Sequence, residues 1–382
     1  MIRNTADQVR PCSDLIMAFV HVRSSALRAM NPFPRFWHAN VIGGGIVVSQ
    51  NEDDVWTIHY TVPPGVDVAT LSADDILALT VGGCGGPMPV PYEEMYCQGV
   101  WKVEVAIANA FRSDGGRIFL AGDAAHQLSP VGGHGLNSGT GDVFDLSWKL
   151  SAVLQGWAGQ DLLSTYDTER RAIAFENLEH VQKGLGDVMP ILTAHLQHGA
   201  DLMESDDDAG RKARGSMIPL CESSSWLHNQ NGNILGCTYK QSPAILTGRE
   251  DGKRPQGTDD VYVPTTYPGS RAPHMWMKEG NSTLDLLSTS SFNVVDFSAD
   301  QALSQPLVQA AKKLRLPLKV LQWSGEDANV KAVYERDLVL IRPDMYVAWR
   351  AGNDSGAALD LEQAVDILRM VSGRGSVQNG NS

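Results

Sequence analysis

The most informative part of the chain is RIFLAGDAAHQLSPVGGHGLNSGTGDVFDLSWKLSAVLQGW, residues 117–157. Residues 117–121 form a short apolar run that predicts a buried strand, ending in the turn Gly122-Asp123. A loop rich in glycine and proline follows over residues 129–135. From Asn137 onward the apolar residues recur at steps of three and four, which predicts a helix with these residues on one face. They are Val143, Leu146, Leu150, Val153, Leu154 and Trp157.

This order of strand, acidic turn, glycine loop and helix is typical of a cofactor site. Glycines before a helix let a ligand approach the backbone closely. The free N–H groups and the dipole at a helix start favour negative charge. Asp123, at the end of the predicted strand, can accept hydrogen bonds from a polyol. The alternative is a tight turn whose glycines serve geometry alone, and the ordered set of glycines argues against it.

The segment before this region predicts an antiparallel sheet. IVVSQ (46–50) and VWTIHYTV (55–62) are short, β-rich and bounded by polar turns, which predicts a hairpin. Residues 70–80 predict a short helix with Ser72 as its N-cap. VWKVEVAIA (100–108) predicts another strand.

The segment after it predicts a second helix and then a separate small α/β unit. The helix begins near Leu163, and the polar residues 200–230 read as a linker or exposed loop. Beyond residue 258, strand-like and helix-like patterns alternate. The predicted strands are 282–287, 292–297, 316–323 and a pair within 337–351 turning at 342–344, and the predicted helices are 300–314 and 361–371.

Composition narrows the function classes. The 382 residues are 43% hydrophobic, and 31 basic against 44 acidic residues give a net charge of −13. That charge argues against nucleic-acid binding and against docking on an anionic membrane. No apolar stretch reaches the length of about 18 residues that a membrane span needs. The N-terminus does not read as a secretory signal, and five cysteines without CxxC spacing predict no disulfide framework and no metal site, so the expected location is cytoplasmic.

Residues 116–159 resemble the second flavin-binding motif of the FAD-dependent aromatic-ring hydroxylases. These are class A flavoprotein monooxygenases of the p-hydroxybenzoate hydroxylase fold, and the similarity is to the phenol and polyketide hydroxylase branch. The resemblance continues at LLSTYDTERRAIA (162–174), GSRAPHMWM (269–277), STLDLL (282–287) and LVLIRPDMYVAWR (338–350).

The resemblance implies an α/β fold in four parts. Residues 1–110 would form the β-sheet portion of a substrate domain, and 111–215 the C-terminal part of a p-hydroxybenzoate hydroxylase-like FAD-binding domain. Residues 216–257 would be a linker, and 258–375 a thioredoxin-like C-terminal domain. No cysteine lies beyond Cys237, which excludes a dithiol role for that last domain and leaves packing or a subunit contact, such as a homodimer.

The resemblance also implies the residues that would bind FAD. Asp123 would hold the ribityl hydroxyls, and Gly122 would permit close approach beside it. The loop facing the isoalloxazine would be shaped by Pro130, Gly132, Gly133 and Gly135. The backbone at Leu136 and Asn137 would stabilise negative charge on the reduced flavin.

The function implied is hydroxylation of an aromatic or polyketide-type small molecule, with NAD(P)H as co-substrate and O2. No catalytic residue is assigned. The GxGxxG motif of the family's N-terminal βαβ unit is not found, because neither Gly43-Gly44-Gly45 nor the glycines at 82–86 precede a helix pattern. We therefore expect the chain to begin inside the middle domain. It would be a truncated hydroxylase, a non-catalytic ligand-binding paralogue with weak or no FAD binding, or one half of a site that another polypeptide completes.

The sequence also predicts roles for individual side chains around the motif. His134 is a candidate to contact the flavin, whereas His126 is expected to pack or cap. Arg170 and Arg171 are expected to pair with Asp167 or Glu169 along their helix. The aromatic side chains of the sheet are expected in the core rather than the substrate pocket, and Glu93-Glu94 is expected to start a solvated helix. The aromatic side chains meant are Trp37, Trp56 and Trp101.

Overall fold

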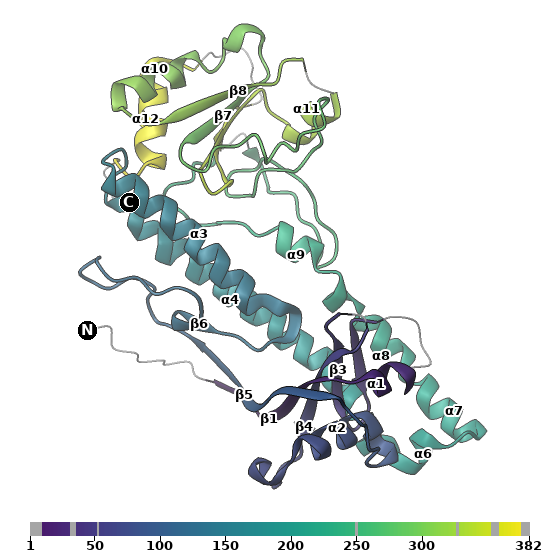
Figure 1. Cartoon of the computed structure of the whole chain (residues 1–382). Helices are drawn as coiled ribbons and strands as arrows, with labels where there is room; N and C mark the ends of the chain where they lie inside the picture. Colours follow the sequence, from purple (N-terminus) through teal and green to yellow (C-terminus); the bar gives the residue numbers. More distant parts are fainter. Residues whose placement is uncertain are drawn as a thin grey trace.

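A computed structural model describes residues 10–30, 36–51, 53–248, 251–325, 328–352 and 359–375. An N-terminal sheet lies at one end of the molecule and a C-terminal α/β unit at the other. Two long helices, α3 (His134–Leu154) and α4 (Asp161–Leu192), run between them (Figure 1). Within the described residues, no helix is both long enough and apolar enough to cross a membrane.

The N-terminal sheet has six antiparallel strands in the order β2-β3-β4-β1-β5-β6. They are β1 (Arg10–Arg23), β2 (His38–Val41), β3 (Gly45–Ser49), β4 (Val55–Val62), β5 (Glu94–Ile107) and β6 (His126–Gln127). The predicted hairpin is confirmed as β3 and β4. One face packs against α2 (Ala73–Gly82), with Ile58 and Leu77 fully buried between them. Ser72 caps α2 as predicted.

The expectation that Glu93-Glu94 starts a helix is wrong. Glu94 is the first residue of β5, which therefore begins six residues before the predicted strand 100–108. The carboxylate of Glu93 accepts hydrogen bonds from the amide and the hydroxyl of Ser25, at 3.0 and 2.6 Å. Glu93 therefore joins the start of β5 to the start of α1 (Ser25–Met30), and Glu94 pairs with Arg23 of β1.

The buried strand predicted over residues 117–121 is also wrong. This segment is extended but forms one isolated bridge, Phe119 with Arg112, and Ile118 is 53% exposed. A buried strand needs hydrogen-bonding partners along both edges. Within the described part of the chain, strand pairing of 117–121 is limited to that single bridge. The segment therefore has the apolar sequence of a core strand but does not form part of a sheet.

The predicted helix after the glycine loop is confirmed, but the predicted apolar face is only partly buried. Leu146, Val153 and Trp157 pack into the cores. Val143 and Leu154 are 58% and 84% exposed. The buried side of α3 carries Asp142, Asp145 and Lys149 beside the apolar Trp148 and Ala152. Charged side chains are buried only when paired, so the partners of these three determine what the helix faces.

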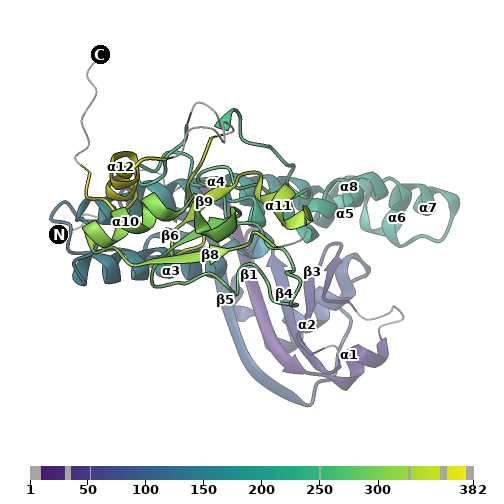
Figure 2. The same ribbon diagram turned by 90° about the horizontal axis from the view of Figure 1, so that it is seen from above.

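Residues 200–230 are helical, which corrects the expected linker or loop. Short helices follow one another here: α5 (Ala194–His198), α6 (Ala200–Glu204), α7 (Asp208–Gly215), α8 (Ile218–Ser223) and, slightly later, α9 (Asn231–Leu235). Asp207 caps α7 by accepting from the amide of Gly210 at 2.7 Å. Met203 and Met217 bury against the end of α4, which holds the polar helices together. Figures 1 and 2 show α6 and α7 extending away from the C-terminal unit.

The C-terminal unit follows the order βαβαββα. Its elements are β7 (Phe292–Asp296), α10 (Gln305–Leu314), β8 (Leu318–Gln322), α11 (Ala328–Tyr334), β9 (Leu338–Ile341), β10 (Val347–Arg350) and α12 (Leu361–Val371). The sheet order is β10-β9-β7-β8, with β7 and β8 parallel and the other pairs antiparallel. The predicted strand 282–287 is wrong, since only Ser282 forms a bridge there, with Trp276.

Alternate residues of the central strand β7 fill two different cores. Val294 joins α10 and α12 in a core that also takes in Trp148 of α3. Val295 faces the other way, toward Tyr334 of α11. The C-terminal unit is therefore docked on the long helices through a shared apolar core.

Candidate cofactor site

The predicted acidic turn is present and is pressed against α3. Gly122 and Asp123 lie in a short 3-10 turn, η3 (Gly122–Ala124), with Gly122 at φ 57° and Asp123 exposed. An added Cβ on Gly139 of α3 would lie 3.1 Å from the Cα of Gly122. Glycine at 139 therefore allows the turn to approach the helix, and it leaves the carboxylate of Asp123 facing solvent.

The predicted glycine loop forms the entry to α3. Pro130 precedes a 3-10 turn, η4 (Val131–Gly133), in which Gly132 and Gly133 have φ of 78° and 70°, a conformation that favours glycine. α3 begins at His134, three residues earlier than expected. Leu136 is therefore in the first helical turn, where helix N–H groups lack partners within the helix. Asn137 follows it and donates its side-chain N–H to the carbonyl of Gly133 at 2.7 Å.

No packing contact within the described chain requires glycine at position 135. It lies inside the first turn of α3, and an added Cβ would meet nothing within 4 Å. Glycine in a helix is about 1 kcal/mol less favourable than alanine. Its neighbour Leu136 is 84% exposed. A bare backbone beside an exposed apolar side chain, at the positive end of a helix, suits a flat ring that becomes anionic, so the residues present fit the cofactor.

Asp142 holds the turn, and the sequence interpretation missed it. Its carboxylate accepts from the amide of Gly122 at 3.0 Å and lies 2.7 Å from His126 Nε2 and 2.8 Å from Arg170 Nε. Burial alone would raise the pKa of Asp142, but the His126 hydrogen bond and the Arg170 charge outweigh it and hold that pKa below its ordinary value. A signal was available, because Ser138, Asp142 and Asp145 recur at helical spacing.

The two histidines of the loop are both buried. His126 packs as expected, 1% exposed and hydrogen-bonded to Asp142. His134 is 6% exposed, and burial, followed by the charge of His180, lowers its pKa. A contact between His134 and flavin stays a prediction.

The expectation for Arg171 is confirmed, and that for Arg170 is wrong. Arg171 Nε lies 3.5 Å from Asp167 on its own helix. Arg170 crosses to α3 and pairs with Asp142. An exposed arginine can pair with an acid one turn away on its own helix. Arg170 is buried between α3 and α4, so it pairs with the acid of α3 that lies opposite it.

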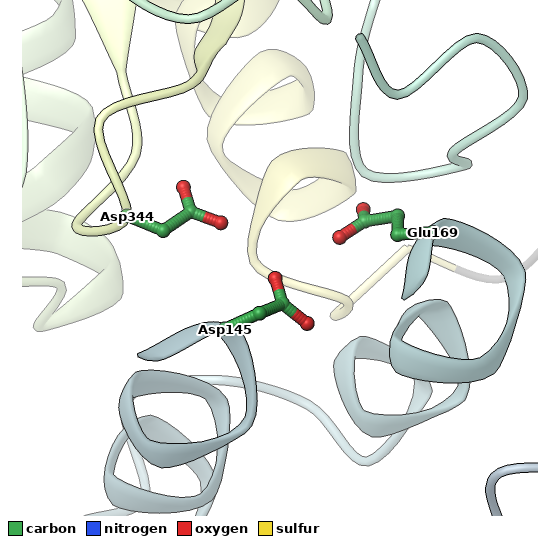
Figure 3. Close-up of side chains that lie close together, drawn as sticks. All are labelled: Asp145, Glu169 and Asp344. Atoms are coloured by element: carbon green, nitrogen blue, oxygen red, sulfur yellow. The ribbon is translucent and has the colours of Figure 1, made fainter. Parts of the chain in front are cut away.

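A second buried cluster brings three carboxylates together. Asp145 comes from α3, Glu169 from α4 and Asp344 from the turn between β9 and β10, and they point toward one another (Figure 3). Lys149 Nζ lies 2.7 Å from Asp145 and 2.6 Å from Glu169, and Arg342 lies 2.6 Å from Glu169. Side-chain cations thus occupy the place that a metal ion would take, and the cluster is an ion-pair network.

The acids of this network outnumber its bases. Three acids face two bases, and burial is the main cause that raises the pKa of Asp145 to about 8. Burial would raise the pKa of Glu169 as well, but the charges of Arg342 and Lys149 hold it well below its ordinary value. The raised pKa of Asp145 favours its neutral form, and a proton there would leave two carboxylates for the two cations.

The sheet presents an aromatic face on the side away from α2. Trp56 is in the core as expected. Trp37 is 72% exposed, so the expectation that it lies in the core is wrong. Trp101 lies on the opposite face, where its Nε1 donates to His59 Nδ1 at 3.4 Å. Phe19 lies beside His59 with ring centroids 5.9 Å apart. Rings on a partly exposed sheet face can pack against an aromatic ligand.

Two family models match the chain. One, described as an FAD binding domain, matches residues 89–181, and the other, described as aromatic-ring hydroxylase, C-terminal, matches residues 265–373. The first covers the acidic turn and the start of α3, and the second covers the C-terminal unit.

Curated relatives and solved structures are similar over almost the whole chain. An FAD-dependent monooxygenase of Emericella nidulans is 34% identical over 95% of this chain and 59% of its own length. One from Penicillium oxalicum is 31% identical over 94% of this chain and 69% of its own length. The rebeccamycin biosynthetic enzyme RebC, in a structure with reduced flavin, matches with a TM-score of 0.75 at 26% identity over 96% of this chain and 65% of RebC. The chain thus spans roughly three fifths to two thirds of these proteins.

Proposed function

This chain belongs to the family of FAD-dependent aromatic-ring hydroxylases, and we propose that it binds FAD and serves the hydroxylation of an aromatic or polyketide-type small molecule. NAD(P)H would be the co-substrate that reduces the flavin. FAD supplies the oxygen chemistry when bound, and the protein supplies binding, orientation and exclusion of water. The observation that carries the proposal is the exposed Asp123 turn packed on α3, whose first turn has bare backbone at Gly135.

Each predicted site residue has a place in this proposal. Asp123 accepts hydrogen bonds from the ribityl hydroxyls, and Gly122 keeps the backbone beside it free of a side chain. The loop from Pro130 to Gly133 turns the chain into α3. The N–H groups from His134 to Leu136 would stabilise negative charge on the cofactor, the role expected of Leu136 and Asn137, because the helix starts three residues earlier than expected.

The aromatic face of the sheet is the proposed surface for substrate. His59 and Trp101 lie on it side by side, and burial, followed by the charge of His38, lowers the pKa of His59. The lowered pKa favours the neutral form of His59. With Nδ1 accepting from Trp101, its Nε2 carries the proton and can donate to a phenol or carbonyl oxygen.

Three narrower expectations stay proposals. The βαβαββα order of the C-terminal unit supports a thioredoxin-like domain. A homodimer and a cytoplasmic location rest on the resemblance and on cysteine usage alone.

The test is titration of the purified chain with FAD, followed by quenching of flavin fluorescence. Asp123→Ala removes the proposed ribityl contact and is expected to weaken FAD binding at least about tenfold, the effect of losing one hydrogen bond to a charged group. Asp114→Ala removes an exposed acid from the same connection and is expected to leave binding unchanged. Absence of saturable quenching by the unmodified chain would contradict FAD binding and favour a ligand-binding protein without redox chemistry.

A further inference from the structure

The Gly122-Asp123 turn is held by contacts that lie behind it, on the side of α3 and α4. Asp142 uses one carboxylate oxygen for two partners, the amide of Gly122 at 3.0 Å and His126 Nε2 at 2.7 Å. Both partners belong to the connection 122–127 that carries Asp123. The carboxylate itself is buried, with a side-chain exposure of 1%, so water does not compete for these hydrogen bonds.

Arg170 fixes the position of that carboxylate. Its Nε donates to the other oxygen of Asp142 at 2.8 Å, and its terminal nitrogen donates to the carbonyl of Ser138 at 3.2 Å. An added Cβ on Gly141 would lie 2.8 Å from Arg170. Glycine at 141 thus leaves room for the guanidinium against α3, as glycine at 139 leaves room for the turn.

Tyr239 continues this chain of contacts to the C-terminal unit. Its hydroxyl lies 3.3 Å from Arg170, and its ring stacks on Tyr346 with centroids 4.1 Å apart. The Arg342 guanidinium lies 5.2 Å from the same ring. The rear of the turn is therefore connected through Arg170 and Tyr239 to the segment between β9 and β10.

We propose that Asp142 is a positioning residue, which with Arg170 holds the Gly122-Asp123 turn in the conformation that receives the cofactor. Asp142 touches no cofactor atom in this proposal and acts through the backbone of Gly122. The inference rests on the proposed function for its meaning, but the ordering of the turn can be measured without FAD. Tyr239 places this positioning pair in contact with the C-terminal unit.

The experiment is hydrogen–deuterium exchange of the full chain without FAD, read at peptides that cover residues 117–128. Asp142→Asn keeps the size of the side chain, but its amide N–H groups must face either Gly122 and His126 or Arg170, so a donor meets a donor. We expect exchange in the turn to accelerate at least about tenfold. Asp145→Asn is the matched control, since it makes the same change one turn along α3 without contact to residues 122–127, and exchange there should be unchanged.

FAD titration of the same proteins separates the two proposals. Weaker FAD binding by Asp142→Asn, with exchange accelerated and the far-UV circular dichroism retained, supports the positioning role. Unchanged exchange in the turn overturns it, whatever the affinity for FAD. If the unmodified chain binds no FAD, the proposed function fails, while accelerated exchange still supports Asp142 as the group that orders the turn. Should Asp142→Asn not fold, Arg170→Lys provides the second variant, because it keeps the charge but loses the two-point contact with Asp142 and Ser138.

Discussion

Gly135 is a residue whose identity is explained by none of its neighbours. Gly139 and Gly141 are the smallest residue because Gly122 and Arg170 lie against them, whereas a Cβ on Gly135 would extend into open space. Glycine is thus required at these positions of one helix for two different reasons. Close packing within the chain requires the first two, and the proposed approach of a ligand accounts for the third.

Gly135→Ala is expected to separate stability from binding. The unliganded chain should gain up to about 1 kcal/mol, because alanine is the better helix former and its Cβ meets no atom. FAD affinity should fall, because the methyl group occupies the proposed path of the ring. Thermal unfolding and FAD titration measure the two effects.

Gly139→Ala is the comparison for that variant. Its Cβ would lie 3.1 Å from the Cα of Gly122, so the unliganded protein should lose stability. If Gly135→Ala leaves FAD affinity unaltered, the ring does not lie over the start of α3.

The helix α3 shows why an apolar pattern can point to the wrong face. Of the apolar residues predicted on one face, Val143 and Leu154 are exposed, whereas charged side chains share the buried side with apolar ones. Asp145 and Lys149 find opposite charges on α4 and on the C-terminal unit. A polar face normally indicates solvent, and only partners that are distant in sequence reverse that inference.

Asp145→Asn is expected to change how stability depends on pH. The pKa of Asp145 is raised to about 8 in the folded chain, from an ordinary 3.8. Between these values the folded state binds more protons than the unfolded state, so this group lowers stability as the pH rises, by roughly 1 kcal/mol per pH unit. The amide of the asparagine variant turns its N–H groups toward Lys149 or Arg342 and costs a fixed amount at every pH, so the stability of the variant relative to the parent should rise by that slope between about pH 4 and pH 8.

Urea unfolding of both proteins at pH 5, 7 and 9 measures this difference. A stability difference that stays constant with pH would show that Asp145 is ionised in the folded protein. Glu169→Gln is the contrasting change, since the low pKa of Glu169 means that an ionised carboxylate is removed from two cations.

The molecule as a whole is held together by the contact of the C-terminal unit with α3 and α4. Arg342 is fully buried there and pairs with Asp145 and Glu169, in addition to Asp344 of its own turn. Its guanidinium also lies 5.2 Å from the ring of Trp148. Arg342 lies in the region that the C-terminal family model matches, whereas Asp145 and Glu169 lie in the region that the FAD-binding model matches.

Arg342→Ala is expected to destabilise the chain by about 3–5 kcal/mol, because it leaves buried carboxylates without their cation. Loss of the contact should also split unfolding into two transitions, one for each side. Differential scanning calorimetry measures both effects. Arg369→Ala, an exposed arginine of α12, provides the control and should be nearly neutral; equal behaviour of the two variants would contradict the role of Arg342.

Local patterns were sufficient for most elements of this fold. The β3–β4 hairpin, the capped helix α2, the turn between β9 and β10 and the bounds of α12 follow from residue spacing, turn residues and caps, which act over a few positions. The glycine and acid pattern at 122–137 likewise identified the candidate site, because a turn and a helix start are local structures.

Contacts between distant segments determined the rest. Residues 117–121 have a strand pattern without a full set of strand partners, and residues 200–230 are polar yet helical because apolar side chains bury against the end of α4. Asp142, Arg170 and Arg342 come from three separate segments, and their pairing depends on how those segments pack. Spacing along the chain reports which side chains share a face, but burial and charge pairing depend on what lies opposite, and that information resides in the tertiary structure.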